Sequence, residues 1–195
     1  MSEAERADGH WVFGYGSLMW RPGFPFAERR PALLRGRRRA FCIHSVHHRG
    51  TPERTGLVLG LAPGGSVRGV AYRVAEQDWL AVHAYLQERE QPTETYVEGS
   101  RPVRLDDGRV VPATVYLSDV THPQWAGLLP LEEQARRIAG ASGLSGRNVD
   151  YLSDLVTHLR ALDVRDPSME RLLAEVTALE AAPSTPPRAA TPAAA

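Results

Sequence analysis

Alternating apolar and polar positions run through the first part of the chain and predict β-strands there. The clearest runs are 11–13, which ends at Gly14, then Leu57, Leu59 and Leu61, then Val70, Tyr72 and Val74. A tight-turn dipeptide, Asp107-Gly108, separates segments 102–105 and 109–117 and predicts a β-hairpin. In the second strand of this hairpin one face carries Val111, Ala113, Val115 and Leu117, and Tyr116 points from the other.

Apolar residues recur with helical spacing in four segments. One helix, 76–90, interrupts the strands, and three more close the chain: 131 to about 141, about 148–162, and one that begins near Ser168. The stripe of the second closing helix consists of Leu152, Leu155, Val156 and Leu159, and that of the third of Met169, Leu172, Leu173 and Val176. Strands first and helices mostly later predict an α+β fold.

The ends of the chain lack this periodicity. Residues 1–10 are predicted to form a flexible arm, and the Ala- and Pro-rich segment 181–195 a disordered tail. Because no linker or repeat interrupts the part between them, a single domain is expected over 11–180. A chain of 195 residues is long enough to bury a core.

Charge and cysteine content narrow the function classes. Lys plus Arg and Asp plus Glu both number 23, a neutral balance that argues against a nucleic-acid-binding protein. The basic run at Arg35, Arg37, Arg38 and Arg39 is interpreted as a solvated strand or loop edge. Cys42 is the only cysteine and lies in an apolar stretch, which predicts a buried, inert thiol and a cytoplasmic protein. No segment approaches the roughly 20 apolar residues of a membrane span, so no membrane partner is expected.

One acid of helix 76–90 lies on the apolar side. At 100° per residue Trp79, Val82 and Leu86 fall within roughly one third of the helix circumference. Glu90 follows Leu86 by four residues and projects from this face, whereas Glu88 lies near the opposite side. A buried carboxylate without a cationic partner has a raised pKa, which suits a general base near neutral pH. The alternative is a solvated Glu90 in a fraying last turn.

The segment 12–20 predicts a strand that breaks into a Gly-x-Gly loop at Gly14 and Gly16. Glycine permits positive φ and close approach of a ligand, and successive N–H groups can bind an anion or an oxyanion. A dinucleotide-binding loop would need a third glycine, and a Walker loop a Gly-Lys-Ser/Thr ending. Neither is present in this segment.

A longer string surrounds this loop. Residues 11–20 read Trp-Val-Phe-Gly-Tyr-Gly-Ser-Leu-Met-Trp, and Pro22-Gly23-Phe24 follow. Further blocks come in order at 49–53, 56–59, 68–73, 85–90, 138–143 and 146–152. Together they resemble the ChaC family of glutathione-specific γ-glutamylcyclotransferases over about residues 11–175. The chain departs from this pattern at 91–96, where many relatives carry a Gly before the Tyr.

The resemblance implies a γ-glutamylcyclotransferase-like fold, a small mixed β-barrel flanked by helices. It implies cleavage of glutathione to 5-oxoproline and cysteinylglycine with Glu90 as catalytic base and then acid, and without metal or cofactor. The substrate-binding loop is then expected to comprise Val12, Phe13, Gly14, Tyr15, Gly16, Ser17 and Leu18.

Other candidate residues leave two interpretations open. Arg49 is placed among the substrate-binding residues because a guanidinium suits a carboxylate, but a structural ion pair fits equally. Tyr116 is included as a cavity residue, with cross-strand packing as its alternative. Asn148, a good N-cap, and Tyr151 are expected to be structural.

Two further chemistries are ranked low. His44, His47 and His48 lie near Cys42, but a strand would not bring them to one face and no carboxylate follows at ligand spacing, so no metal site is expected. Ser17 lacks the frame of an acyl-transfer nucleophile. Besides the glutathione-cleaving enzyme, two functions stay open: a cyclotransferase for other γ-glutamyl amines, and a non-catalytic regulator of cation transport. The oligomeric state is left open.

Overall fold

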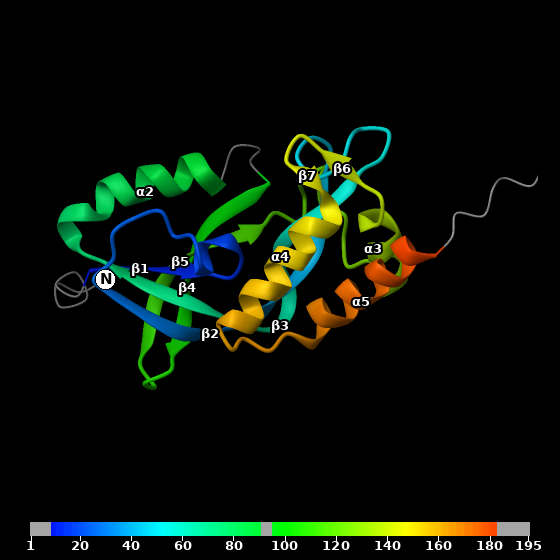
Figure 1. Ribbon diagram of the computed structural model, residues 1–195. Helices are drawn as coiled ribbons and strands as arrows, with labels where there is room; N and C mark the ends of the chain where they lie inside the picture. Colours follow the sequence, from blue (N-terminus) through cyan, green and yellow to red (C-terminus); the bar gives the residue numbers. More distant parts are fainter. Residues whose placement is uncertain (1–8, 91–94, 183–195) are drawn as a thin grey trace, which may run out of the picture.

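Five strands of the described residues close into a barrel in the order β1-β3-β2-β4-β5 (Figure 1). The computed structural model describes residues 9–90 and 95–182. The strands are β1 His10–Gly14, β2 Glu28–Ser45, β3 Gly56–Val74, β4 Tyr96–Leu105 and β5 Val110–Ser118. β1 closes the barrel because it pairs antiparallel with β3 and parallel with β5. The predicted α+β fold and the predicted hairpin, here β4–β5 with Gly108 at φ +91°, are confirmed.

The longest strands, β2 and β3, pair antiparallel along almost their whole length. Both bend, β2 at Gly36 with φ +76° and β3 at Gly64 and Gly65 with φ +85° and +73°. The two alternating runs at 57–61 and 70–74 are therefore parts of one strand. β2 had no clear sequence signal, because Pro31, Gly36 and exposed arginines interrupt its alternation.

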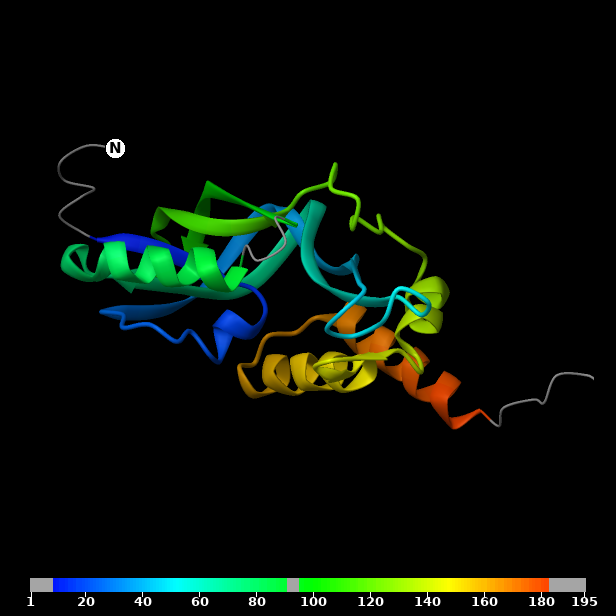
Figure 2. The ribbon, with the colours of Figure 1, turned by 90° about the horizontal axis from the view of Figure 1, so that it is seen from above.

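The helices lie outside the barrel in two groups. Their bounds are α2 Glu76–Glu90, α3 Leu131–Ile138, α4 Asn148–Ala161 and α5 Pro167–Ala181; a 3-10 turn, η1, spans Ser17–Met19, and a two-strand ribbon consists of β6 Ser142–Gly143 and β7 Gly146–Arg147. Figures 1 and 2 show α2 beside one end of the barrel and α3, α4 and α5 gathered toward the other. The four predicted helices are confirmed, with α3 ending three residues earlier than expected, before Gly140 at φ +67°.

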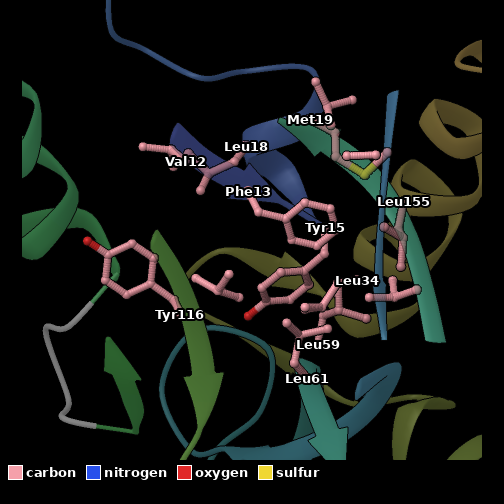
Figure 3. Packing of buried hydrophobic residues seen from close by; sticks show 14 of the residues in the cluster. Val12, Phe13, Tyr15, Leu18, Met19, Leu34, Leu59, Leu61, Tyr116 and Leu155 are labelled. Carbon is pink, nitrogen blue, oxygen red and sulfur yellow. The ribbon is translucent and has the colours of Figure 1, made fainter. Parts of the chain in front are cut away.

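The hydrophobic core fills the barrel and continues under α4 and α5. The predicted stripe of α4 is buried, as are Met169, Leu172 and Val176 of α5. Inside the barrel, Phe13 and Tyr15 from the first strand and the loop after it pack with Leu34, Leu59 and Leu61 from β2 and β3 (Figure 3). The core thus joins the Gly-x-Gly loop to the long strands.

Arg39 corrects the interpretation of the basic run as a solvated edge. Its side chain is only 1% exposed and pairs with Asp166 at 2.6 Å, the residue that caps α5. It also donates to the backbone carbonyls of Tyr15 and Arg68, both at 2.8 Å. A buried charge is tolerated when it is paired and hydrogen-bonded, and this one is both.

The predicted arm and tail fall mostly outside the described residues, namely 1–8 and 183–195. At the described margins, His10 already begins β1 and Ala181 ends α5, so both belong to regular elements rather than to an arm or tail. Among the described helices none has the length and apolar character needed to cross a membrane.

Removing Asp166 is expected to destabilise the fold strongly. Asp166→Ala leaves the Arg39 charge buried without its partner, a loss of about 3–5 kcal/mol in the free energy of unfolding. The control is Asp150→Ala, because Asp150 is exposed and lies 3.9 Å from Arg147, so its pair contributes about 1 kcal/mol or less. Urea denaturation of both variants measures the difference, and equal losses would contradict the role given to Arg39.

Candidate active site

Two glycines bring the end of β1 close to the segment that follows it. Neither has positive φ, contrary to expectation: Gly16 has φ −127° and ψ −133°. The reason for glycine is space. A Cβ at Gly14 would lie 2.9 Å from Leu18 Cβ, and one at Gly16 would lie 3.1 Å from Leu59 Cδ2.

The carbonyl groups of this loop accept hydrogen bonds from buried side chains. Arg39 donates to the carbonyl of Tyr15 at 2.8 Å. The Tyr72 hydroxyl contacts the carbonyls of Leu18 at 3.0 Å and Met19 at 2.8 Å. Both donors are buried, so the loop has little freedom to rotate its peptide groups.

The N–H groups of the same loop have no such partners. Within residues 9–90 and 95–182, the amides of Gly16, Ser17 and Leu18 donate to no acceptor. Unbonded N–H groups on consecutive residues form a binding site for an anion or for an oxyanion that develops during a reaction.

Glu90, the last residue of α2, lies on the buried side of its helix as predicted. Val82 and Leu86 are buried, Glu88 is exposed, and the Glu90 side chain is 19% exposed. The expectation that Glu90 has no cationic partner is wrong, since Arg89 Nε lies 3.1 Å from Glu90 Oε1. Burial nevertheless raises the pKa of Glu90, and the opposing effect of Arg89 is smaller.

Glu90 and the glycine loop line one small cavity. This inner cavity measures about 60 Å³. Its lining consists of Tyr15, Gly16, Ser17, Leu18, Leu59, Glu90, Tyr96 and Tyr151. This cavity is therefore lined both by a carboxyl with a raised pKa and by the three residues whose N–H groups are unbonded among the described residues.

A larger outer cavity of about 340 Å³ adjoins the inner one. Glu90, Tyr96 and Tyr151 line both, so the two cavities meet at these side chains. The outer cavity is lined further by Arg89 of α2, by His44 of β2, and by His47, His48 and Arg49 of the segment after β2. It is wide enough to hold a portion of a substrate that extends beyond the inner cavity.

Tyr96 and Tyr151 form the wall between the cavities. The Tyr96 hydroxyl donates to the carbonyl of Leu59 at 2.6 Å. Burial raises the pKa of Tyr151 to about 12, so this phenol stays neutral at ordinary pH. Tyr151 was expected to be purely structural, but its ring also lines the inner cavity together with Glu90. The packing of α4 against the barrel brings it there. Of the departure at 91–96, residues 91–94 lie outside the described part.

Four of the predicted binding residues lie elsewhere. Val12, Phe13 and Gly14 are buried and pair with β3, and none of them lines the two cavities. The ring of Tyr116 belongs to the core cluster, and its hydroxyl donates to Glu98 Oε2 at 3.2 Å, across the β4–β5 pair (Figure 3). These four residues therefore pack within the fold and line neither cavity.

Arg49 is held without a carboxylate. Its guanidinium lies 5.1 Å from the ring centroid of Tyr151 and donates to the carbonyl of Arg147 at 3.2 Å. No described Asp or Glu lies within ion-pairing distance of it. Arg49 was predicted either to bind a substrate carboxylate or to form a structural ion pair. The ion pair is not found among the described residues.

Asn148 has a structural role, although not as an N-cap. Its side chain is fully buried, accepts from Leu57 N–H and donates to the Leu57 carbonyl, both at 2.7 Å. It thus acts as a strand partner for β3. The missed signal is the pairing of a side-chain amide with a backbone 91 residues away, which spacing along the chain does not reveal.

The cysteine and histidine residues near the cavity form no metal cluster in the described part of the chain. Cys42 is buried, as expected. His44 lines the outer cavity, and its Nδ1 is buried with no hydrogen-bond partner among the described residues. Burial lowers the pKa of His44, with a smaller contribution from Arg137, so its imidazole is kept neutral.

Comparisons with known proteins agree with this arrangement. The family model for ChaC-like proteins matches residues 10–179. A glutathione-specific gamma-glutamylcyclotransferase of Escherichia coli (strain K12) is 39% identical over 87% of this chain and 73% of its own. One of Schizosaccharomyces pombe is 33% identical over 85% of this chain and 91% of its own.

A solved structure shows the same fold. The crystal structure of a glutathione-specific γ-glutamyl cyclotransferase from yeast superposes with a TM-score of 0.77 and 26% identity, covering 88% of this chain and 99% of that one.

The thiol of Cys42 is expected to resist alkylation in the native protein. Burial raises its pKa to about 12, so little thiolate is present near neutral pH. Iodoacetamide at pH 8 followed by mass spectrometry measures the modified fraction, and the urea-unfolded protein is the control. Equal labelling of native and unfolded protein would refute the burial of this thiol.

Proposed function

The chain belongs to the family of ChaC-like proteins, and we propose that it is a γ-glutamylcyclotransferase that cleaves glutathione to 5-oxoproline and cysteinylglycine. One observation carries the mechanism: Glu90 lines the same cavity as Gly16, Ser17 and Leu18, whose N–H groups have no acceptor among the described residues. The reaction needs a base for an ammonium group and donors for an oxyanion. This cavity supplies both.

In the proposed reaction Glu90 removes one proton from the α-ammonium group of the substrate. The resulting amine attacks the γ-carbonyl carbon of the same molecule and closes a five-membered ring. The carbonyl oxygen becomes an oxyanion and receives hydrogen bonds from the loop amides, each worth about 3–4 kcal/mol in such a site.

The intermediate then breaks the bond to the cysteinyl nitrogen. Protonated Glu90 gives its proton to this leaving nitrogen, and the ring nitrogen releases its second proton, which Glu90 accepts and passes on. Two protons have moved from the attacking to the leaving nitrogen, and Glu90 is again a carboxylate. One carboxyl serves as base and acid, so the proposal requires no metal or cofactor.

The shape of the site supports an intramolecular attack. We place the γ-glutamyl end in the inner cavity, between Glu90, Tyr15 and Ser17, and the remaining dipeptide in the outer cavity. Holding the glutamyl chain curled replaces a search among many conformations with a near-attack geometry. Burial of Glu90 favours its neutral, proton-carrying form.

We assign Arg49 to the C-terminal carboxylate of the substrate. It lines the outer cavity and is held by the Tyr151 ring rather than by a carboxylate. A guanidinium matches a carboxylate through two parallel hydrogen bonds. The reaction is placed in the cytoplasm, because the only cysteine of the sequence is a free, buried thiol that suits a reducing compartment.

Glu90→Gln is expected to lower kcat by about 10²–10⁴-fold, the usual contribution of general acid–base catalysis. Release of 5-oxoproline from glutathione measures it. In the wild type kcat/KM should fall as the pH decreases through the pKa of Glu90, since only the carboxylate accepts a proton. Because burial raises this pKa, the fall should begin above the ordinary range of glutamate.

The matched control is Glu88→Gln, the same change on the exposed side of the same helix. It should keep the wild-type rate and pH profile. A folded Glu90→Gln protein that releases 5-oxoproline at the wild-type rate would rule out this mechanism.

Arg49→Gln is expected to lower kcat/KM for glutathione by about 10- to 100-fold, the size of a charge-assisted hydrogen bond. With glutathione amidated at its glycyl carboxylate, wild type and variant should react alike. Arg54→Gln is the control, because Arg54 is exposed and donates to the Ala139 carbonyl outside the cavities.

Equal losses with both substrates would mean that Arg49 supports the fold and not the substrate. If instead the wild type prefers γ-glutamyl amines without a carboxylate at this position, the alternative cyclotransferase function replaces the one proposed.

A further inference from the structure

Arg89, the residue before the proposed base, connects α2 with the segment that follows the glycine loop. Its Nη1 donates to the carbonyls of Arg21 at 2.6 Å and Pro22 at 3.1 Å. Its Nη2 donates to Ser17 Oγ at 2.9 Å. Its Nε lies 3.1 Å from Glu90 Oε1. All three guanidinium nitrogens are therefore engaged, and they contact both Glu90 and Ser17 of the glycine loop.

The helix itself holds this guanidinium in place. Tyr85, one turn earlier on α2, accepts from Arg89 Nη1 at 2.9 Å, and the guanidinium carbon lies 5.9 Å from the centre of the Tyr85 ring. Gly23 allows the approach: it has φ +76°, and a side chain there would collide with the Tyr85 hydroxyl. The segment after the loop is thus shaped to receive Tyr85 and Arg89 together.

We propose that Arg89 is a positioning residue that holds Glu90 at a constant separation from the N–H groups of Gly16, Ser17 and Leu18 and supplies the positive charge that both ends of the site share. This inference rests on the function proposed above. It assigns Arg89 no contact with the substrate.

The movement of charge in the reaction explains why one cation serves two groups. Before the proton transfer the negative charge is on the Glu90 carboxylate. After ring closure it is on the oxyanion at the donor loop, while Glu90 is neutral. Arg89 contacts both Glu90 and Ser17. The negative charge therefore stays close to the guanidinium before and after ring closure. Fixed charges and dipoles of this kind stabilise a developing charge with little reorganisation.

Other charged and titratable groups interact electrostatically with Glu90 or line the same cavities. They are Tyr15 after β1, Tyr96 on β4, Tyr116 on β5 and Tyr151 on α4, and, at the outer cavity, Arg49 with His44, His47 and His48. Burial raises the pKa of all four tyrosines, so they are neutral in the working pH range. The histidines and Arg49 are present in every variant below, so their effect is common to all curves.

Arg89→Gln is expected to change two quantities. The acidic limb of the kcat/KM profile should move to higher pH, because the cation that lowers the pKa of Glu90 is removed. At the optimum pH kcat should fall by about 100-fold, the loss that a displacement of about 1 Å produces in a catalytic geometry. Release of 5-oxoproline from glutathione measures both. A residue with a merely structural role would lower the amount of folded enzyme without moving the limb.

Two further variants separate charge from connection and serve if Arg89→Gln fails to fold. Arg89→Lys keeps the charge but cannot reach all the acceptors, so its acidic limb should stay at the wild-type pH while kcat falls. Ser17→Ala removes the hydroxyl that links the loop to Arg89 and keeps the loop amide; its kcat should fall by about tenfold with an unmoved limb. Ser17→Ala in the Arg89→Lys background should add less than in the wild type. Because Ser17 also lies beside the γ-glutamyl end, this double variant shows how much of the loss depends on Arg89.

Arg101→Gln is the matched control, since Arg101 is exposed and, within the described part of the chain, donates only to the neighbouring Ser100 carbonyl. It should reproduce the wild-type curve. The inference is overturned by an unmoved limb in folded Arg89→Gln, by a moved limb in Arg89→Lys, or by wild-type kcat in Ser17→Ala. These results leave the proposed function intact as long as Glu90→Gln is inactive; an active Glu90→Gln enzyme would overturn the function itself.

Discussion

The buried guanidinium of Arg39 joins three distant parts of the chain. Its partners are the carbonyl of Tyr15 in the glycine loop, the carbonyl of Arg68 in β3, and the carboxylate of Asp166 at the start of α5. A charge removed from water requires all of these contacts, because any one left open would cost free energy. The same demand holds the loop with its carbonyls toward the interior. Its amides are then left for the cavity.

A second balance operates at Glu90. Burial favours the neutral carboxyl, and the C-terminal end of α2 adds a field of the same sign. Arg89 opposes both, but its charge is spread over several carbonyl and hydroxyl acceptors. The result is a carboxyl whose pKa stays raised beside a permanent cation. Such a group can both accept and return a proton, which a strongly paired carboxylate or an isolated buried acid does less well.

The cavity results from the way the barrel and the last helices meet. Tyr96 comes from β4 and Tyr151 from α4, and both rings stand between the inner and the outer cavity. Asn148 anchors the start of α4 to β3 by two hydrogen bonds. α4 therefore has a structural role at one end and a role in the site one turn later. Residues from both the barrel and the helices therefore line the candidate site.

The sequence by itself determined the elements whose signals are local. The β4–β5 hairpin follows from one turn dipeptide, and the burial of Glu90 follows from the 3.6-residue period of α2, since these depend on neighbours within a few residues. The blocks of family resemblance located the glycine loop and the acid. The positive φ expected at Gly14 and Gly16 was nevertheless wrong, and their crowding by Leu18 and Leu59 is not visible along the chain.

Only the tertiary structure decided what lies across the cavity from these residues. Arg39 reads as part of a solvated basic run, yet it is buried because Asp166, 127 residues later, neutralises it. Tyr151 was expected to be structural, yet it lines the inner cavity together with Glu90. Arg89 carried no prediction beyond its place in the block 85–90, yet it reaches Ser17, 72 residues away. Periodicity describes which side of an element is buried, but it does not say what that side meets. That depends on how the barrel closes and where the helices pack.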